Sequence, residues 1–278
     1  MSEELVAALR QIAEILERLA PPPPPRLSFD AARLFAHDAR TGACHPAPDF
    51  PLALDLLVGV DRQKTRLVDT FERFGRGLPA NHVLLWGARG AGKSSLAKAA
   101  FMAVSAEWSM KLIEIDRDSV TALPALFRTL RARDERFVVL CDDLSFEEGA
   151  AAAKALKSAL EGGVEGPPPN VLFVATSNRR HLMPRGHAES EGPLAAAEDA
   201  EEEVSVSDRF GVWIGFGPMD QEAYLTAVRG YADRFSLSVA DLDRRALQWA
   251  RLRGSRSGRI AWQFALELAG ELGKPLPM

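Results

Sequence analysis

The fold of this chain can be predicted from one segment, Val83-Leu84-Leu85-Trp86-Gly87-Ala88-Arg89-Gly90-Ala91-Gly92-Lys93-Ser94-Ser95. A short apolar run comes first, the pattern G-x-x-x-x-G-K-[ST] follows, and a helical stretch over Lys93–Glu107 comes next. Glycines let backbone N–H groups converge on phosphate oxygens, because no Cβ stands in the way. The start of the helix adds partial positive charge. The segment therefore predicts a phosphate-binding loop between a strand and a helix.

Each part of this loop has an expected partner in a nucleoside triphosphate. The Lys93 ammonium would reach the β- and γ-phosphates, and the Ser94 hydroxyl would bind Mg²⁺. We therefore expect ATP and Mg²⁺ as cofactors. The candidate nucleotide-binding residues of the loop are Gly87, Ala88, Arg89, Gly90, Ala91, Gly92, Lys93, Ser94 and Ser95.

A second apolar run ends in two carboxylates. Phe137–Cys141 has the pattern of a buried strand, and Asp142 and Asp143 follow it directly. Asp142 would hold Mg²⁺ through water. The position after such a Mg²⁺-binding aspartate is commonly a glutamate that orients the attacking water. Asp143 is one methylene shorter, so Glu147 or Glu148 remains an alternative for that task.

Short apolar runs alternate with helical stretches through the middle of the chain. Alternation of this kind predicts an α/β fold with a parallel sheet. After Gly217 we expect helices alone, and before Leu57 we expect helix and loop. The predicted strands are Val83–Trp86, Leu112–Ile115, Phe137–Cys141, Val171–Ala175 and Val212–Phe216. The predicted helices are Lys93–Glu107, Gly149–Glu161, Asp220–Phe235, Asp241–Arg253 and Arg259–Leu272.

Composition excludes several classes of protein. The 278 residues are 47% hydrophobic and 26% charged, which fits a globular protein with a substantial core. The net charge of −4 argues against a surface that binds nucleic acid everywhere. We find no 18-residue apolar run and no signal-peptide pattern, and Cys44 and Cys141 lack metal-type spacing. We expect a cytoplasmic protein without membrane contact.

Four regions are predicted along the chain. Residues 1–20 form an amphipathic helix, and residues 21–26 form a linker that contains five prolines. Residues 27–217 form the nucleotide-binding core with an N-terminal helical extension, and residues 218–278 form a helical subdomain. Within the core, the acidic stretch 185–203 is expected to be a solvated loop.

From about Leu57 onward the sequence resembles AAA+ ATPases. The resemblance implies a three-layer P-loop NTPase fold with strand order 5-1-4-3-2 and a C-terminal helical lid. It places Val58 and Gly59 beside adenine and Asn178 as the sensor 1 residue near the γ-phosphate. It implies that Arg259 contacts the nucleotide from the lid as sensor 2, with Arg256 as the rival.

The resemblance also makes Arg209, in Ser207-Asp208-Arg209-Phe210, an arginine finger that acts on a neighbouring subunit. A structural ion pair is the alternative for this residue. More narrowly, Cys141–Phe146, Leu156–Gly163, Thr176–Pro184 and Arg253–Arg259 are similar to a bacterial AAA+ family known as domain of unknown function 815.

The leading hypothesis is therefore a Mg²⁺-ATP-hydrolysing enzyme, with Asp143, Asn178, Arg209 and Arg259 as catalytic residues and Ser94 and Asp142 as metal ligands. It would assemble into a ring or filament and remodel an unknown protein partner. The alternative is a nucleotide-gated binding or scaffold module with negligible turnover; a P-loop phosphotransferase is a third, less favoured option. Nucleic-acid binding through the arginines of residues 244–259 is possible but not favoured.

Overall fold

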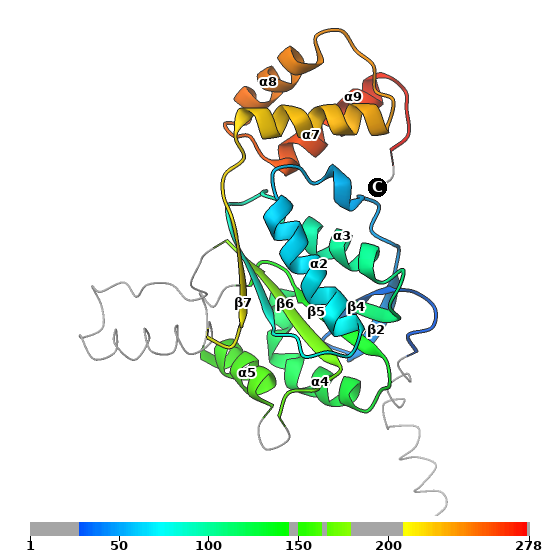
Figure 1. The fold of residues 1–278 in the computed structure, drawn as a ribbon, viewed down its shortest axis with the longest axis vertical. Coiled ribbons are helices and arrows are strands. Elements are labelled where there is room, and N and C mark those ends of the chain that lie inside the picture. Colours follow the sequence, from blue (N-terminus) through cyan, green and yellow to red (C-terminus); the bar gives the residue numbers. More distant parts are fainter. Residues whose placement is uncertain (1–27, 145–149, 163–165, 179–207, 277–278) are drawn as a thin grey trace, which may run out of the picture.

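The computed structural model describes residues 28–144, 150–162, 166–178 and 208–276. The described residues form a seven-stranded sheet with the order β2-β1-β4-β5-β6-β3-β7 (Figure 1). The strands are β1 (Leu34–Asp38), β2 (Ala43–Ala47), β3 (Val83–Gly87), β4 (Met110–Ile115), β5 (Arg136–Cys141), β6 (Val171–Ser177) and β7 (Val212–Phe216). Strands β4, β5, β6, β3 and β7 are parallel to their neighbours, so their carboxyl ends share one edge.

The sheet lies between two layers of helices because its strands are apolar on both faces. Along β5, Phe137, Val139 and Cys141 pack on one side, and Val138 and Leu140 pack on the other. The first side is covered by α4 (Leu123–Arg131), α5 (Ala150–Glu161) and the 3₁₀ segment η2 (Arg117–Ala122). The second side is covered by α2 (Asp61–Gly75) and α3 (Lys93–Val104). Full burial of both faces is typical of parallel sheets.

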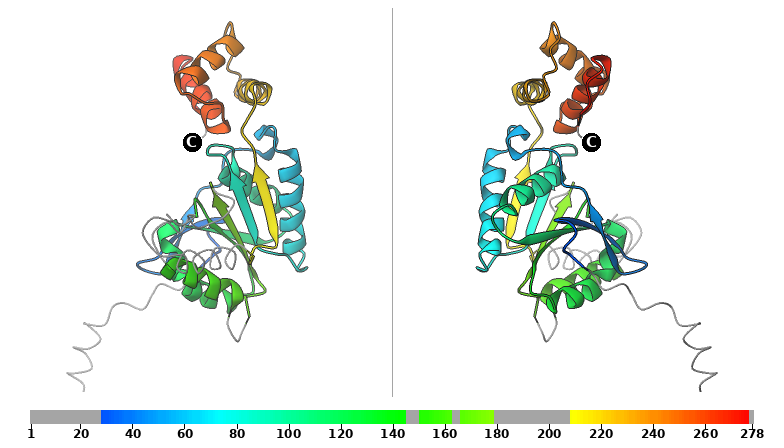
Figure 2. Two further views of the ribbon diagram at one scale, coloured as in Figure 1. Left: turned by 90° about the vertical axis from the view of Figure 1, so that its left-hand side faces the viewer. Right: turned by 90° about the vertical axis from the view of Figure 1, so that its right-hand side faces the viewer.

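A separate helical lid stands above the sheet edge at which β3 and β7 end (Figure 2). It contains α7 (Gln221–Arg234), α8 (Leu242–Leu252) and α9 (Gly258–Glu271), and it has its own buried cluster, which includes Tyr224 and Phe264. The 3₁₀ segment η1 (Leu54–Leu56) adds Leu56 to that cluster, so the core and the lid touch there. The predicted fold class, a parallel AAA+ sheet with a helical lid, is confirmed.

The five predicted strands are all present: the bounds of Val212–Phe216 are exact, and the other four differ by no more than two residues at either end. Strand order β7-β3-β6-β5-β4 corresponds to 5-1-4-3-2. The predicted helices of the core and of the lid are also present with small shifts at their ends. Within the ranges that the structure describes, no helix combines the length and apolarity needed to cross a bilayer.

The expectation of helix and loop before Leu57 was wrong for residues 34–47. This stretch forms an antiparallel hairpin, β1 and β2, and β1 extends the sheet in parallel beside β4. The two residues His45 and Pro46 of β2 are consecutive and both exposed, so β2 lacks the regular alternation of buried and exposed residues. Its first strand is stabilised by burial of Phe35, whose ring packs edge-on against Phe29.

Several predictions lie outside the described residues. They are the helix 1–20, the linker 21–26, the acidic loop 185–203, and the two alternative water-orienting residues Glu147 and Glu148.

Candidate nucleotide-binding site

A cleft of about 880 Å³ lies between the carboxyl ends of the parallel strands and the lid. Ligands of open α/β folds bind at this edge of the sheet. The cleft is lined by residues of the glycine-rich loop, of the ends of β5 and β6, of the segment after β2, and of α7 and α9. The predicted site residues in its lining are Arg89, Gly90, Ala91, Gly92, Lys93, Ser94, Ser95, Asp142, Asp143, Asn178 and Arg259.

Two glycines of the loop occupy positions that a larger residue would strain. Gly87 has φ +132°, and a Cβ there would lie 2.1 Å from the Phe216 carbonyl oxygen at the end of β7. Gly90 has φ +72°, and its Cβ would lie 2.9 Å from the Ser257 hydroxyl of the lid. The glycines therefore serve two close approaches, one to the neighbouring strand and one to the lid.

Lys93 is nearly buried at the first position of α3. Its ammonium donates to the carbonyl oxygens of Gly87 and Ala88, both at 2.9 Å, and to Asn178 Oδ1 at 3.0 Å. Burial lowers the pKa of Lys93, and the carboxylates of Asp143 and Asp142 oppose that shift. The Lys93 ammonium therefore lies at the floor of the cleft, beside the start of α3, where the helix favours a bound phosphate.

Ser94 and Asp142 meet at the end of β5. The Ser94 hydroxyl donates to Asp142 Oδ1, and the Thr176 hydroxyl donates to the same oxygen at 2.5 Å. A hydroxyl and a carboxylate are oxygen ligands, which a hard cation such as Mg²⁺ prefers. These two side chains fit the metal role expected of them, because they bring such ligands to one point beside the glycine-rich loop.

Asp143 adopts a left-handed conformation, with φ +55°, which costs a non-glycine residue roughly 1 kcal/mol. Its backbone N–H donates to Thr176 Oγ1 at 2.9 Å, and its carboxylate accepts from Asn178 Nδ2 at 2.5 Å. Asn178 therefore bridges Lys93 and Asp143. The two predicted catalytic residues lie together in the cleft, and Asp143 is held through both its backbone and its side chain.

The lid closes the cleft with α9. Arg259 lies in the first turn of this helix, and its backbone N–H donates to the Gly90 carbonyl oxygen at 3.4 Å. Trp262, one turn further along, also lines the cleft and packs edge-on against Tyr231 of α7. Arg256, the rival for the sensor 2 role, instead donates to the Gln221 side chain. The geometry favours Arg259, since it is the arginine that borders the glycine-rich loop.

Arg209 lies outside the cleft of its own chain. It pairs with Glu161 at the last residue of α5. The hydrogen bond from Arg209 holds the pKa of the Glu161 carboxyl below its usual value. The ion pair expected as the alternative for Arg209 is therefore present, and the finger role stays a prediction, because an arginine finger would complete the site of a neighbouring subunit and not its own.

The structure does not bring Val58 and Gly59 into the lining of the cleft. Val58 packs against the lid cluster, and a Cβ at Gly59 would lie 3.4 Å from that of Ala223 in α7. Leu57, directly before them, does line the cleft. The segment therefore borders the cleft through Leu57, and a place for Val58 and Gly59 beside adenine stays a prediction.

Sequence reasoning missed one wall of the cleft. The segment 48–52, which follows β2, contributes Phe50 and Leu52, and the ion pair between Lys98 and Glu114 (2.7 Å) lies beside Phe50. No motif marks these residues. Trp262 could have been predicted to line the cleft, because it follows Arg259 by three residues and therefore shares its helix face.

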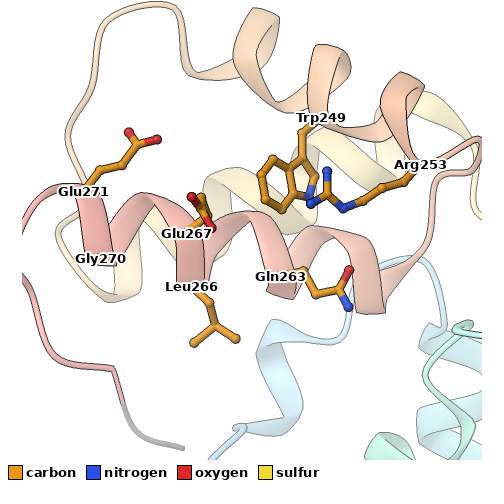
Figure 3. A pocket seen from close by; sticks show the side chains of 7 residues that line it. All are labelled: Trp249, Arg253, Gln263, Leu266, Glu267, Gly270 and Glu271. Atoms are coloured by element: carbon orange, nitrogen blue, oxygen red, sulfur yellow. The ribbon is translucent and has the colours of Figure 1, made fainter.

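A second hollow, of about 490 Å³, lies on the outer surface of the lid between α8 and α9 (Figure 3). The Arg253 guanidinium stacks over the Trp249 ring at 3.2 Å from its centroid. The hollow is lined by Trp249, Arg253, Gln263, Leu266, Glu267, Gly270 and Glu271, none of which is a predicted residue of the nucleotide site. The cleft at the glycine-rich loop is therefore the candidate functional site.

Comparison with a solved structure supports the same fold. The Aeropyrum pernix Orc1 protein, solved in complex with DNA, is 16% identical, with a TM-score of 0.55, over 81% of this chain and 61% of that chain. Thermotoga maritima RuvB, a Holliday junction branch migration motor, is 18% identical, with a TM-score of 0.49, over 81% of this chain and 72% of that one. A comparison with curated proteins gives no match.

A family model described as "Protein of unknown function (DUF815)" matches residues 30–272. This range contains the hairpin, the glycine-rich loop, the end of β5 and the whole lid. The sheet order, the P-loop and the lid are those of an AAA+ P-loop ATPase fold, which is a nucleotide-binding fold. The chain therefore belongs to the DUF815 family and has the AAA+ fold.

Proposed function

We propose that the protein is a Mg²⁺-dependent ATPase that works as a homo-oligomer and uses the energy of hydrolysis to remodel a protein partner. One observation carries the proposal: Lys93, Ser94, Asp142, Asp143 and Asn178 meet in a single cleft that a lid covers. Phosphoryl transfer needs positioning and charge stabilisation more than covalent chemistry. These residues supply both.

Each side chain has a task in the proposed reaction. Lys93 binds the β- and γ-phosphates once it leaves the loop carbonyls, and Arg259 contacts the nucleotide from the lid. Ser94 and Asp142 would hold Mg²⁺, which would neutralise charge on the phosphate oxygens. Asp143 accepts a proton from the attacking water, and Asn178 orients that water or the γ-phosphate.

Arg209 is proposed to complete the site of a neighbouring subunit. An arginine side chain places planar, permanently charged donors against the charge that develops on the transferred phosphoryl group. The neighbour must then approach the open side of the cleft, and the pair between Arg209 and Glu161 must open or rearrange. Hydrolysis would change the angle between lid and core and thereby move the bound partner.

A nucleotide-gated binding module is the second candidate. The observation that favours it is Asp143 itself, which is shorter than glutamate and accepts a hydrogen bond from Asn178. In this case nucleotide binding alone would control association with a partner, and turnover would be negligible.

The rate of ATP hydrolysis per subunit, measured against protein concentration, separates the two candidates. Light scattering on the same samples, with and without ATP, gives the mass. The ATPase proposal predicts a rate per subunit that rises as the mass rises to an oligomer. Arg209→Ala should bind ATP normally and lose most of that rate. A rate near zero at every concentration, with ATP still bound, would instead support the gated module.

A further inference from the structure

Thr176 lies near the end of β6, beside the carboxylates of Asp142 and Asp143. The sequence motifs assign it no role. It is 1% exposed and is the penultimate residue of the strand. Its hydroxyl hydrogen is directed to Asp142 Oδ1 at 2.5 Å, and its hydroxyl oxygen accepts from the Asp143 backbone N–H at 2.9 Å. The Thr176 hydroxyl thus donates a hydrogen bond to Asp142 and accepts one from Asp143, the next residue along the chain.

The backbone of Thr176 extends the same contact. Its carbonyl oxygen accepts from the Leu144 N–H at 2.7 Å. Strand register explains the arrangement, because Cys141 of β5 lies opposite Ala175 of β6, which brings the next residue of each strand together. Thr176 therefore fixes the turn of chain that follows β5, including the left-handed conformation of Asp143.

We propose that Thr176 is a positioning residue, which sets the orientation of the Mg²⁺-binding carboxylate of Asp142 and the backbone turn that presents Asp143. This inference rests on the proposed function. The Thr176 hydroxyl shares Asp142 Oδ1 with the Ser94 hydroxyl, so it limits rotation of the carboxylate. Groups that hydrogen-bond to a metal ligand in this way orient the ligand and tune its affinity.

The test compares Thr176→Val with Thr176→Ser. Valine keeps the shape of the side chain and lacks the hydroxyl, whereas serine keeps the hydroxyl and lacks the methyl group. Thr70→Val is the matched control, because Thr70 is equally buried and its hydroxyl donates to the Arg66 carbonyl oxygen within α2, away from the cleft.

The first measurement is the affinity for a fluorescent, non-hydrolysable ATP analogue with and without Mg²⁺. The dissociation constant without Mg²⁺ divided by the one with Mg²⁺ reports how much the metal contributes to binding, without any turnover. We expect Thr176→Val to reduce this ratio by about tenfold or more, while the affinity without Mg²⁺ changes less than about twofold. Thr176→Ser and Thr70→Val should keep the ratio within about twofold of the wild-type protein.

The second measurement is kcat at saturating ATP and Mg²⁺. We expect a loss of about tenfold or more for Thr176→Val, because Asp143 is presented by the same turn. If Thr176→Val keeps both the metal ratio and kcat, or if Thr176→Ser is impaired equally, the hydroxyl has no positioning role. If the wild-type protein shows neither a gain in affinity with Mg²⁺ nor turnover, the proposed function fails and this inference fails with it.

Discussion

The core wall of the cleft is tied together across three elements, whereas the lid wall meets it through sparse contacts. We define the core wall as Arg89–Ser95, Asp142, Asp143, Thr176 and Asn178, and the lid wall as Tyr231, Gly258, Arg259 and Trp262. Hydrogen bonds link Lys93 to Asn178, Asn178 to Asp143, and Thr176 to both carboxylates. Between the lid wall and the glycine-rich loop, the hydrogen bond from Arg259 to Gly90 is long, at 3.4 Å.

The difference separates two tasks. The side chains of the core wall are held by these hydrogen bonds, so in the proposed reaction Lys93, which must leave the loop carbonyls, is the core-wall residue that has to rearrange. The lid has its own buried cluster, which Leu56 of η1 joins, so a change in the angle of the lid would be taken up at that contact. We therefore expect defects in the core wall to abolish nucleotide binding or hydrolysis, and defects in the lid wall to weaken them.

Loss of the core-wall cation should have the largest effect. Lys93→Ala removes the ammonium at the floor of the cleft, and we expect ATP affinity to fall at least about 100-fold because the charge proposed to meet the β- and γ-phosphates is lost. Titration with a fluorescent ATP analogue measures the loss. Lys64→Ala is the control, since Lys64 lies in α2 and pairs with Asp61. Unchanged ATP affinity in Lys93→Ala would place the nucleotide elsewhere.

Loss of the proposed base should separate chemistry from binding. Asp143→Asn keeps the shape of the side chain and removes its capacity to accept a proton. We expect kcat to fall about 100-fold while the dissociation constant for ATP stays within about twofold. Single-turnover kinetics with labelled ATP measures both. A variant with normal kcat would show that another residue carries the proton.

The lid wall should give an intermediate effect. Arg259→Ala would remove the proposed charged contact from the lid to the nucleotide, and we expect kcat/KM to fall about tenfold. Arg256→Ala is the matched control, because Arg256 donates to Gln221 and does not line the cleft. We expect it to stay within about twofold of the wild-type kcat/KM. The reverse order of the two variants would assign the sensor 2 role to Arg256.

The smallest expected effect concerns the ion pair between Arg209 and Glu161, which lies outside both walls of the cleft. The hydrogen bond from Arg209 lowers the pKa of Glu161, so ionised Glu161 stabilises the folded state at neutral pH. That contribution is present above the usual glutamate pKa of about 4.3 and is lost as the pH falls through the lowered value. Glu161→Gln should therefore lower the thermal unfolding midpoint slightly at pH 7, and the difference should vanish in acid. A difference that stays constant with pH would contradict this origin.

Much of the core wall could be predicted from the sequence because its signals are local. The loop that ends in Lys93 and Ser94 is a contiguous motif, and Asp142 follows a strand that is apolar on both faces. Thr176 could not be assigned, since its partners depend on the register of β5 against β6. Tertiary register has no signature in a single sequence.

The hairpin was missed for a different reason. Strands β1 and β2 contain His37, Asp38 and Pro46, which weaken the alternating apolar pattern on which strand prediction depends. The wall of the cleft that follows β2 was missed with it. Of the segment expected beside adenine, Leu57 lines the cleft, whereas Val58 and Gly59 do not. Positions set by packing between distant segments were the ones that could not be predicted.

The most direct test of the central claim is a mixing experiment with two variants. Asp143→Asn has an intact Arg209 and a defective site, and Arg209→Ala has an intact site without the proposed finger. We predict that each variant alone hydrolyses ATP slowly, and that mixing them restores activity well above the sum of the two. Restoration would require an ATPase site completed by a neighbouring subunit. A mixture that never exceeds the sum of its parts, across protein concentrations at which the wild-type chain is an active oligomer, would contradict the account.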